Sequence, residues 1–157
     1  MFNMAIILVA AVAAGPSASV QQTCSNTQTA SRVLVEKMGQ GRFEISDEIY
    51  APGFVAHGFG RDYSLEEDNA SGKQIRAAFP DLKVSVLRTT AERDLVAVHW
   101  RSDGTNTVKV GAFPGAGKRV TVDGMTFFRL VDCRIVEEWS TYDNLGVMQQ
   151  LGLLPAK

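Results

Sequence analysis

The sequence predicts an α+β domain in which N-terminal helices pack on a strongly curved antiparallel β-sheet, giving a cone-shaped domain around one pocket. Apolar residues recur at helical spacing through the first part of the chain, and after Leu82 the period changes to two. The strand-like segments follow one another across short turns, which indicates antiparallel pairing because parallel strands need a long crossover. Helices that precede a run of strands are typical of α+β rather than alternating α/β folds.

Two helices are expected before residue 52. Val33, Leu34 and Met38 recur at helix-compatible spacing and predict a long helix, and the glycines at 39 and 41 separate it from a shorter one. The shorter helix ends at the Pro52-Gly53 pair, because proline cannot continue the helical hydrogen-bond ladder. Residues 54–58 are expected to follow as a short extended piece.

Two further helices flank the strands. Ser64 and Glu67 have the spacing of a capping box, in which each side chain satisfies the other residue's backbone N–H, and they predict a helix that ends at Pro80. A short helix from Asn144 to Leu151 is expected at the end of the chain. Turn residues between the two helices separate strands that we expect at 82–87, 95–100, 105–110, 119–130 and 134–142.

Residues 1–24 are predicted to be a signal peptide or other N-terminal leader, and residues 25–157 to be one α+β barrel domain. An apolar run at 4–14 precedes small residues, and the first charged side chain is Arg32, as expected around the apolar region of an export signal. The segment before the run has no Lys or Arg, so an uncleaved apolar extension is the alternative. The expected location is secreted or periplasmic, with the cytoplasm as the alternative.

The composition favours a small lipophilic molecule as partner. The chain has 16 Lys and Arg against 17 Asp and Glu, a net charge of −1, so it offers no basic surface for nucleic acid and no basic run for a membrane beyond the leader. Cys24 and Cys133 are not part of a zinc-binding pattern, and no metal is expected. The two cysteines either form the disulfide of an exported protein or are unpaired thiols.

The strand at 134–142 carries the most informative side chains. Successive residues of a strand point to opposite faces, so Glu137 and Trp139 share one face while Glu138, Ser140 and Tyr142 share the other. Whichever face looks inward, the pocket receives one of the two adjacent glutamates. Burial of that carboxyl group would raise its pKa toward neutrality, which is the condition for efficient proton transfer.

Seven short segments together resemble the SnoaL-like polyketide cyclase and ester cyclase group, within the nuclear-transport-factor-2-like superfamily. They occur in the expected order over residues 30–154. The resemblance implies the cone-shaped fold and a homodimer that forms through the sheet. The segments are 49–58 (IYAPGFVAHG), 78–82 (AFPDL), 94–100 (DLVAVHW), 124–129 (GMTFFR), 134–139 (RIVEEW), 142–146 (YDNLG) and 149–152 (QQLG).

The resemblance also implies a reaction. The family cyclases that it matches use no metal and no organic cofactor, and an aspartate acts as general acid and base on an enolisable carbonyl compound to drive an intramolecular aldol closure. The match places Ser140 at the position of that aspartate and Thr126 at the position of an assisting histidine. A polar helper of the family falls near Ala56 or His57.

The match at Ser140 selects the face of Glu138 as the inward one. We therefore expect Glu138 to be the catalytic carboxylate, with Ser140 and Tyr142 as its hydrogen-bonding partners and His57 at the pocket rim. Three of the candidate residues have an alternative interpretation. Glu138 could be a solvated strand residue, His57 a surface-loop residue, and Asp143 the N-cap of the last helix. The remaining pocket-lining residues are expected to be Phe54, Thr126, Phe128, Trp139 and Asp143.

Three functions are compatible with these observations. The first is a cofactor-free cyclase or isomerase that uses general acid/base chemistry on a small lipophilic carbonyl compound. The second is a hydrolase that activates water, and the third is a non-catalytic module for small-ligand binding or dimerisation. The residues at positions 140 and 126 favour the third function, as does the leader.

Overall fold

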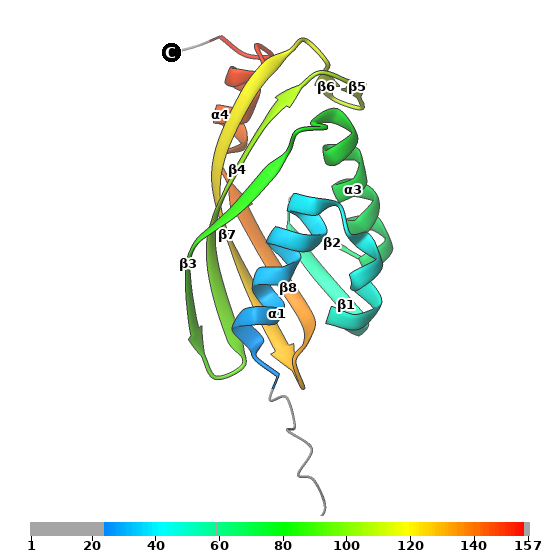
Figure 1. Cartoon of the computed structure of the whole chain (residues 1–157), viewed down its shortest axis with the longest axis vertical. Helices are drawn as coiled ribbons and strands as arrows, with labels where there is room; N and C mark the ends of the chain where they lie inside the picture. The colour runs from blue at the N-terminus through cyan, green and yellow to red at the C-terminus, as the bar shows by residue number, and fades with distance from the viewer. Residues whose placement is uncertain (1–23, 59, 156–157) are drawn as a thin grey trace, which may run out of the picture.

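The structure is a computed structural model and describes residues 24–58 and 60–155. Helices cover one face of a curved six-stranded sheet, and a short C-terminal helix lies at one end of it (Figure 1). This arrangement confirms the predicted α+β fold class with helices on a curved sheet. The leader predicted for residues 1–24 lies outside the described residues, apart from Cys24. Within the described ranges no helix is long and apolar enough to cross a membrane.

The helical elements agree with the sequence pattern except in one respect. The predicted long helix is present, but its second half is π-helical, a wider turn that apolar spacing does not reveal. The capping box of Ser64 and Glu67 is confirmed, and Asp143 caps the last helix. The elements are α1 (Asn26–Arg32), η1 (Val33–Gly39), η2 (Phe43–Ile45), α2 (Ser46–Ile49), α3 (Leu65–Ala78) and α4 (Asn144–Gln150).

The six strands of the sheet have the order β2-β1-β8-β7-β4-β3, so β2 and β3 are its edges and the sheet does not close into a barrel. All neighbouring pairs are antiparallel except β1 and β8, which are parallel because the chain crosses the whole sheet between them. The strands are β1 (Tyr50–Gly58), β2 (Arg61–Tyr63), β3 (Lys83–Glu92), β4 (Leu95–Asn106), β7 (Lys118–Val131) and β8 (Arg134–Tyr142), with a separate ribbon of β5 (Lys109–Val110) and β6 (Phe113–Pro114).

Two strand predictions need correction. The strand expected at 105–110 is divided between the end of β4 and the short β5. The extended piece expected at 54–58 begins earlier, at Tyr50, and contains Pro52. The pairing of β1 with β8 shifts register between Tyr50 and Val55, so Pro52 lies where the ladder is interrupted and its missing N–H costs no strand pairing.

The alternation of the strands divides the sheet into an inner face, toward the helices, and an outer face. Thr126 and Glu138 are inner-face residues, whereas Phe127 and Trp139 pair with each other on the outer face. Under the helices the inner face forms an apolar core. Its fully buried side chains include Val96, Val98, Phe128, Leu130 and Ile135.

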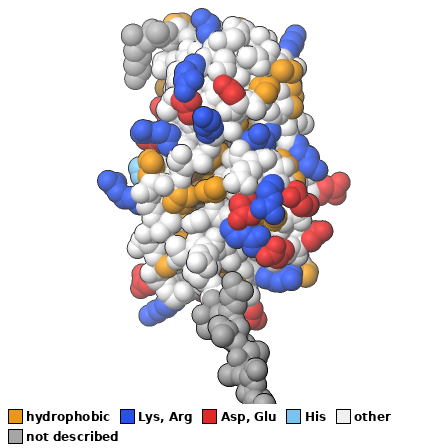
Figure 2. Space-filling model, viewed as in Figure 1, with side chains coloured by type: hydrophobic (Ala, Val, Ile, Leu, Met, Phe, Trp, Pro, Cys, Tyr) orange, Lys and Arg blue, Asp and Glu red, His pale blue; other side chains and the backbone are white. Residues whose placement is uncertain are grey.

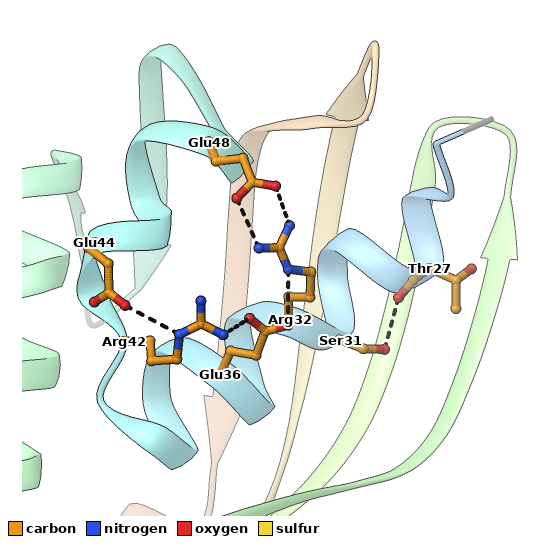
Figure 3. Close-up of polar contacts among 7 residues, drawn as sticks. All are labelled: Thr27, Ser31, Arg32, Glu36, Arg42, Glu44 and Glu48. Atoms are coloured by element: carbon orange, nitrogen blue, oxygen red, sulfur yellow. Dashed lines mark hydrogen bonds and ion pairs between the residues drawn. The ribbon is translucent and has the colours of Figure 1, made fainter. Parts of the chain in front are cut away.

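Ion pairs fasten the first helices to one another (Figure 3). The two terminal guanidinium nitrogens of Arg32 donate to the Glu48 carboxylate, at 2.6 and 3.0 Å, and Arg42 donates to Glu36 at 2.7 Å. Figure 2 shows acidic and basic side chains intermingled over this part of the surface. Exposed pairs of this kind each stabilise a fold by about 0–1 kcal/mol, so they contribute little to the stability of the domain.

A disulfide joins Cys24 to Cys133 in the turn between β7 and β8, which confirms one of the two interpretations of the cysteines. The Cα atoms are 6.0 Å apart, within the usual range for such a bond. The bond spans 109 residues and thereby connects the start of α1 to the end of the sheet. A loop of that length is expected to contribute about 4–5 kcal/mol by restricting the unfolded chain.

Candidate functional site

A cavity of about 280 Å³ lies between the inner face of the sheet and the helices. Most of its wall is apolar, and much of this part belongs to a second core cluster, which includes residues of α3 and α4. The polar residues of the wall come from η1, α3, β4, β7, β8 and α4. The apolar wall includes Ile75, Phe79, Leu82, Val84, Val120 and Val147, and the polar wall includes Lys37, Asp68, Thr126, Glu138 and Ser140.

Glu138 supplies a buried carboxyl group to this cavity. Its Oε1 accepts a hydrogen bond from Ser140 Oγ at 3.0 Å, whereas its buried Oε2 accepts none among the described residues. Burial is the main reason that the pKa of Glu138 is raised from 4.5 to about 7, and the nearby charge of Asp68 adds to it. Lys37, Ser140 and Tyr50 act in the opposite direction. Because Oε2 is buried, the carboxyl group of Glu138 does not lie in bulk solvent.

A chain of hydrogen bonds orients that carboxyl group. Trp100 Nε1 donates to Thr126 Oγ1 at 2.9 Å, and Thr126 Oγ1 and Ser140 Oγ are also 2.9 Å apart. Thr126 accepts the indole N–H, so its own proton is available to Ser140, and the Ser140 proton points to Glu138. Each donor in the chain therefore has one acceptor, and Glu138 is the final one.

The ring of Trp100 can occupy this position because β7 carries glycine at 124. Gly124 is the register partner of Trp100, and a Cβ atom on residue 124 would overlap the indole ring. Tyr142, on the inner face of β8, lines the cavity beside Trp100, with 6.4 Å between the ring centroids. Burial raises the pKa of Tyr142, so its hydroxyl keeps its proton at neutral pH.

Lys37 is a buried cation of the site that the sequence analysis missed. Its side chain is 1% exposed, and its Nζ donates to Asp68 Oδ2 at 2.6 Å and to Tyr50 Oη at 3.0 Å. One signal could have revealed it, since Lys37 follows Leu34 by three residues and Val33 by four and therefore shares their apolar helix face. The spacing alone would not have identified Asp68 and Tyr50 as its partners.

Two predicted site residues, His57 and Trp139, lie on the outer face of the sheet and do not line the cavity. They are register partners in β1 and β8, and their rings stack with centroids 4.9 Å apart. His57 Nδ1 lies 2.8 Å from Asp62 Oδ1, and Nε2 lies 3.3 Å from Glu137 Oε1. The prediction that His57 is at the pocket rim is therefore wrong, because strand alternation turns it away from Glu138.

Three further expected lining residues also lie outside the cavity wall. Phe54 and Phe128 are 5% and 0% exposed and belong to the apolar core. Asp143 accepts a hydrogen bond from the backbone N–H of Gly146 at 2.8 Å, so the N-cap alternative is confirmed. Of the predicted site, Glu138, Ser140, Tyr142 and Thr126 are brought together.

The resulting arrangement can transfer a proton. A carboxyl group whose pKa is near neutrality lies in an apolar hollow, with hydroxyl donors on one side and an ammonium group close by. Within residues 24–58 and 60–155, no group of three or more His, Cys, Asp and Glu side chains is arranged to hold a metal ion.

Comparison with known proteins places these observations in one family. The model of the SnoaL-like polyketide cyclase family matches residues 28–151. No curated protein matches the sequence. Three solved structures show the same fold over most of their length. They are IdmH, a proposed polyketide cyclase from Streptomyces antibioticus (27% identity, TM-score 0.73, covering 82% of this chain and 99% of IdmH), a proposed SnoaL-like polyketide cyclase from Jannaschia sp. CCS1 (28%, 0.74, 83% and 93%), and AclR, a proposed hydroxylase from Streptomyces galilaeus (22%, 0.76, 84% and 83%).

Proposed function

Because the chain belongs to the SnoaL-like polyketide cyclase family, we propose that it is a cyclase- or isomerase-type enzyme that performs cofactor-free acid/base chemistry on a small lipophilic carbonyl compound. Glu138 is the general base, and Tyr142 donates to the oxygen of the enolate that forms. The observation that carries the proposal is the buried Glu138 carboxyl group, with a pKa of about 7, in an otherwise largely apolar cavity.

The position of Glu138 supports a relocated acid/base group. The family resemblance places an aspartate at position 140, where this chain has serine. Glu138 is the adjacent inner-face residue of β8, and its carboxylate accepts a hydrogen bond from Ser140 Oγ. The carboxylate therefore lies next to the point where the family aspartate would begin.

The cavity volume supports a small substrate. An apolar cavity of about 150 Å³ holds benzene, so about 280 Å³ accommodates roughly two fused rings. A bicyclic enolisable ketone such as 2-tetralone is therefore a suitable probe, whereas a flat four-ring polyketide would extend beyond this volume.

Exchange of the ketone's α-hydrogens in deuterated water, followed by NMR, tests the proposal. The wild-type protein should accelerate exchange, and the rate should rise between pH 6 and pH 8 as Glu138 ionises. Glu138→Gln should lower the rate by a factor of about 100 or more, because general-base catalysis contributes about 10²–10⁴-fold.

The matched control is Glu137→Gln, which removes the neighbouring carboxylate from the outer face and should leave exchange within about threefold of wild type. Undiminished exchange by the Glu138→Gln variant would remove Glu138 from the mechanism. Tight binding of the ketone without exchange would support the second candidate, a non-catalytic binding module, which the serine and threonine at the family's acid/base positions favour.

We also propose that the protein acts outside the cytosol. The apolar run at 4–14 and the Cys24–Cys133 disulfide support an export route, because structural disulfides form and persist in oxidising compartments. Expression of the full-length chain with fractionation of the cells tests this point. Recovery of the protein in the cytosol with both thiols free would contradict it.

A homodimer through the outer face is proposed on the basis of exposed apolar side chains. Met125, Phe127 and Trp139 are 48%, 45% and 38% exposed on adjacent outer-face positions of β7 and β8. Sedimentation equilibrium should give twice the monomer mass, and Phe127→Asp should shift the protein to the monomer. A wild-type protein that is monomeric at millimolar concentration would exclude the dimer.

A further inference from the structure

Two groups at the polar end of the cavity have unused and complementary hydrogen-bonding capacity. Glu138 Oε2 is buried and accepts no hydrogen bond among the described residues. Lys37 has three ammonium protons, of which Asp68 Oδ2 and Tyr50 Oη take two within the same part of the chain. A buried polar atom without a partner costs about 1–3 kcal/mol, so a ligand that satisfies both groups gains affinity from each.

The two groups lie at the same end of the cavity. Lys37, Asp68 and Glu138 all line it, and the charges of Asp68 and Lys37 both act on the Glu138 carboxyl group. Tyr50 connects them, because its hydroxyl accepts from Lys37 Nζ at 3.0 Å and its side chain also favours the ionised form of Glu138. Their elements, η1 and β8, are far apart in sequence, so the fold alone brings this donor and this acceptor together.

The charges at this end restrict what can bind. One ammonium group, Lys37, is balanced by Asp68 at 2.6 Å, and Glu138 adds a second carboxyl group. A ligand carboxylate or phosphate would be a third acidic group against one cation, which the electrostatics disfavour. A neutral group that both donates and accepts a hydrogen bond fits both unused positions, and a hydroxyl group has that property.

We propose that the polar end of the cavity is a subsite for one enolic or phenolic hydroxyl group. The hydroxyl donates its proton to Glu138 Oε2, and its oxygen accepts a hydrogen bond from Lys37 Nζ. The rest of the ligand is an apolar body of about two rings that lies against the wall formed by Ile75, Phe79, Leu82 and Val84. The proposal deepens the proposed function and rests on it in one respect, that the bound hydroxyl is the enol form of the carbonyl substrate.

In the reaction this subsite adds Lys37 to the catalytic residues. The Glu138 carboxylate takes a proton from the carbon next to the carbonyl, the C–H electron pair forms the C=C bond, and the C=O π pair moves to oxygen. The Lys37 N–H stabilises the charge that develops on this oxygen. Glu138 then returns its proton to the oxygen and gives the enol. Atoms and charge balance without another reactant.

Binding of three naphthalenes tests the subsite without any turnover. 2-Naphthol donates and accepts a hydrogen bond, 2-methoxynaphthalene only accepts, and naphthalene does neither. Titration of the full-length protein at pH 8, where Glu138 is largely ionised, should give a Kd for 2-naphthol about 10–100-fold below those of the other two compounds. Affinities within threefold of one another, or no binding of 2-naphthol, would overturn the proposal.

Two variants test whether Lys37 and Glu138 cause the preference for 2-naphthol. Lys37→Met and Glu138→Met, with a fold confirmed by circular dichroism, should each reduce the advantage of 2-naphthol over 2-methoxynaphthalene to below threefold. The matched control is Lys83→Met, an exposed lysine at the start of β3, which should keep the full advantage. An advantage that survives in both Lys37→Met and Glu138→Met would refute the subsite; where Lys37→Met does not fold, Glu138→Met and the wild-type series decide.

This test can fail independently of the proposed enzymatic function. A preference for 2-naphthol together with no exchange of 2-tetralone would support the subsite and refute the catalytic proposal. Exchange of 2-tetralone without a preference for 2-naphthol would support the enzyme and refute the role of Lys37 and Oε2 in holding the hydroxyl.

Discussion

Glu137 and Glu138 are consecutive residues of one strand, and their pKa values are shifted in opposite directions. On the outer face, the Arg129 guanidinium holds the pKa of Glu137 below its usual value, and His57 adds to the effect. On the inner face, burial raises the pKa of Glu138 to about 7. The same side chain therefore ionises more readily in one position and less readily in the next, and the pleat of the strand places the two carboxyl groups in these different environments.

The two glutamates also differ in how their charge is compensated. Glu137 accepts two hydrogen bonds from Arg129, and His57 Nε2 lies within hydrogen-bond distance of its other oxygen. Its carboxylate is therefore paired with basic side chains. Glu138 accepts one hydrogen bond, from the Ser140 hydroxyl. The nearby cation, Lys37, forms its ion pair with Asp68 and acts on Glu138 only through its charge. An incompletely compensated carboxylate is available for chemistry, whereas a fully paired one is part of the surface structure.

The largest expected effect that tests this comparison is on stability at alkaline pH. A raised pKa means that the folded state binds the Glu138 proton more tightly, so stability falls as pH rises from 4.5 through 7, by up to about 3 kcal/mol. Glu138→Gln should therefore be more stable than wild type by about 1–3 kcal/mol at pH 8.5 and no more stable at pH 4. Urea unfolding at both pH values measures this. Glu137→Gln should show no such gain, and an equal gain in both variants would remove the distinction between the faces.

A smaller effect concerns the hydroxyl that supports Glu138. Ser140 donates to the ionised carboxylate, so Ser140→Ala should raise the pKa of Glu138 further and leave less base at pH 6. Exchange of 2-tetralone should fall about three- to tenfold at pH 6 and stay nearly unchanged at pH 9, where the base is ionised in both proteins. Thr141→Val, on the opposite face, is the control. A loss that is equal at both pH values would indicate a structural role for Ser140 instead.

The smallest effect is expected on the outer face. The pKa of His57 is raised, first by its hydrogen bond with Asp62 and then by Glu137, so its stabilisation is present below pH 6.5 and is lost as pH rises through the raised value. His57→Gln should therefore lower the melting temperature slightly at pH 5.5 and not at pH 9. His99→Gln removes the other histidine and serves as the control. A larger destabilisation at pH 9 than at pH 5.5 would contradict this sign.

Much of the fold follows from local patterns in the sequence. The capping box at Ser64, the change to period two after Leu82 and the N-cap at Asp143 each depend on neighbours within a few residues. The parallel pairing of β1 with β8 does not, because it brings together residues about 80 apart in the chain. The π-helical turn that carries Lys37 is likewise invisible to apolar periodicity.

The site residues also fall into those that local sequence patterns predict and those that only tertiary contacts reveal. Strand alternation and the resemblance at Ser140 were enough to identify Glu138, Ser140, Tyr142 and Thr126 as cavity residues. The error at His57 arose because a residue at the end of an extended piece could be assigned a face only once its partner, Trp139, was known. Lys37 was missed because a buried lysine is stable only beside specific partners, and only the tertiary structure shows them.

Gly124 links the shape of the cavity to the hydrogen bonding of Glu138. The indole of Trp100 occupies the space that any side chain at position 124 would fill, and the same indole begins the hydrogen-bond chain that ends at Glu138. A methyl group added there would displace the ring and disturb its hydrogen bond to Thr126. Under the proposed function, a change at position 124 would alter the shape of the cavity and the acidity of Glu138 together, so substrate range and pH optimum would be inherited together.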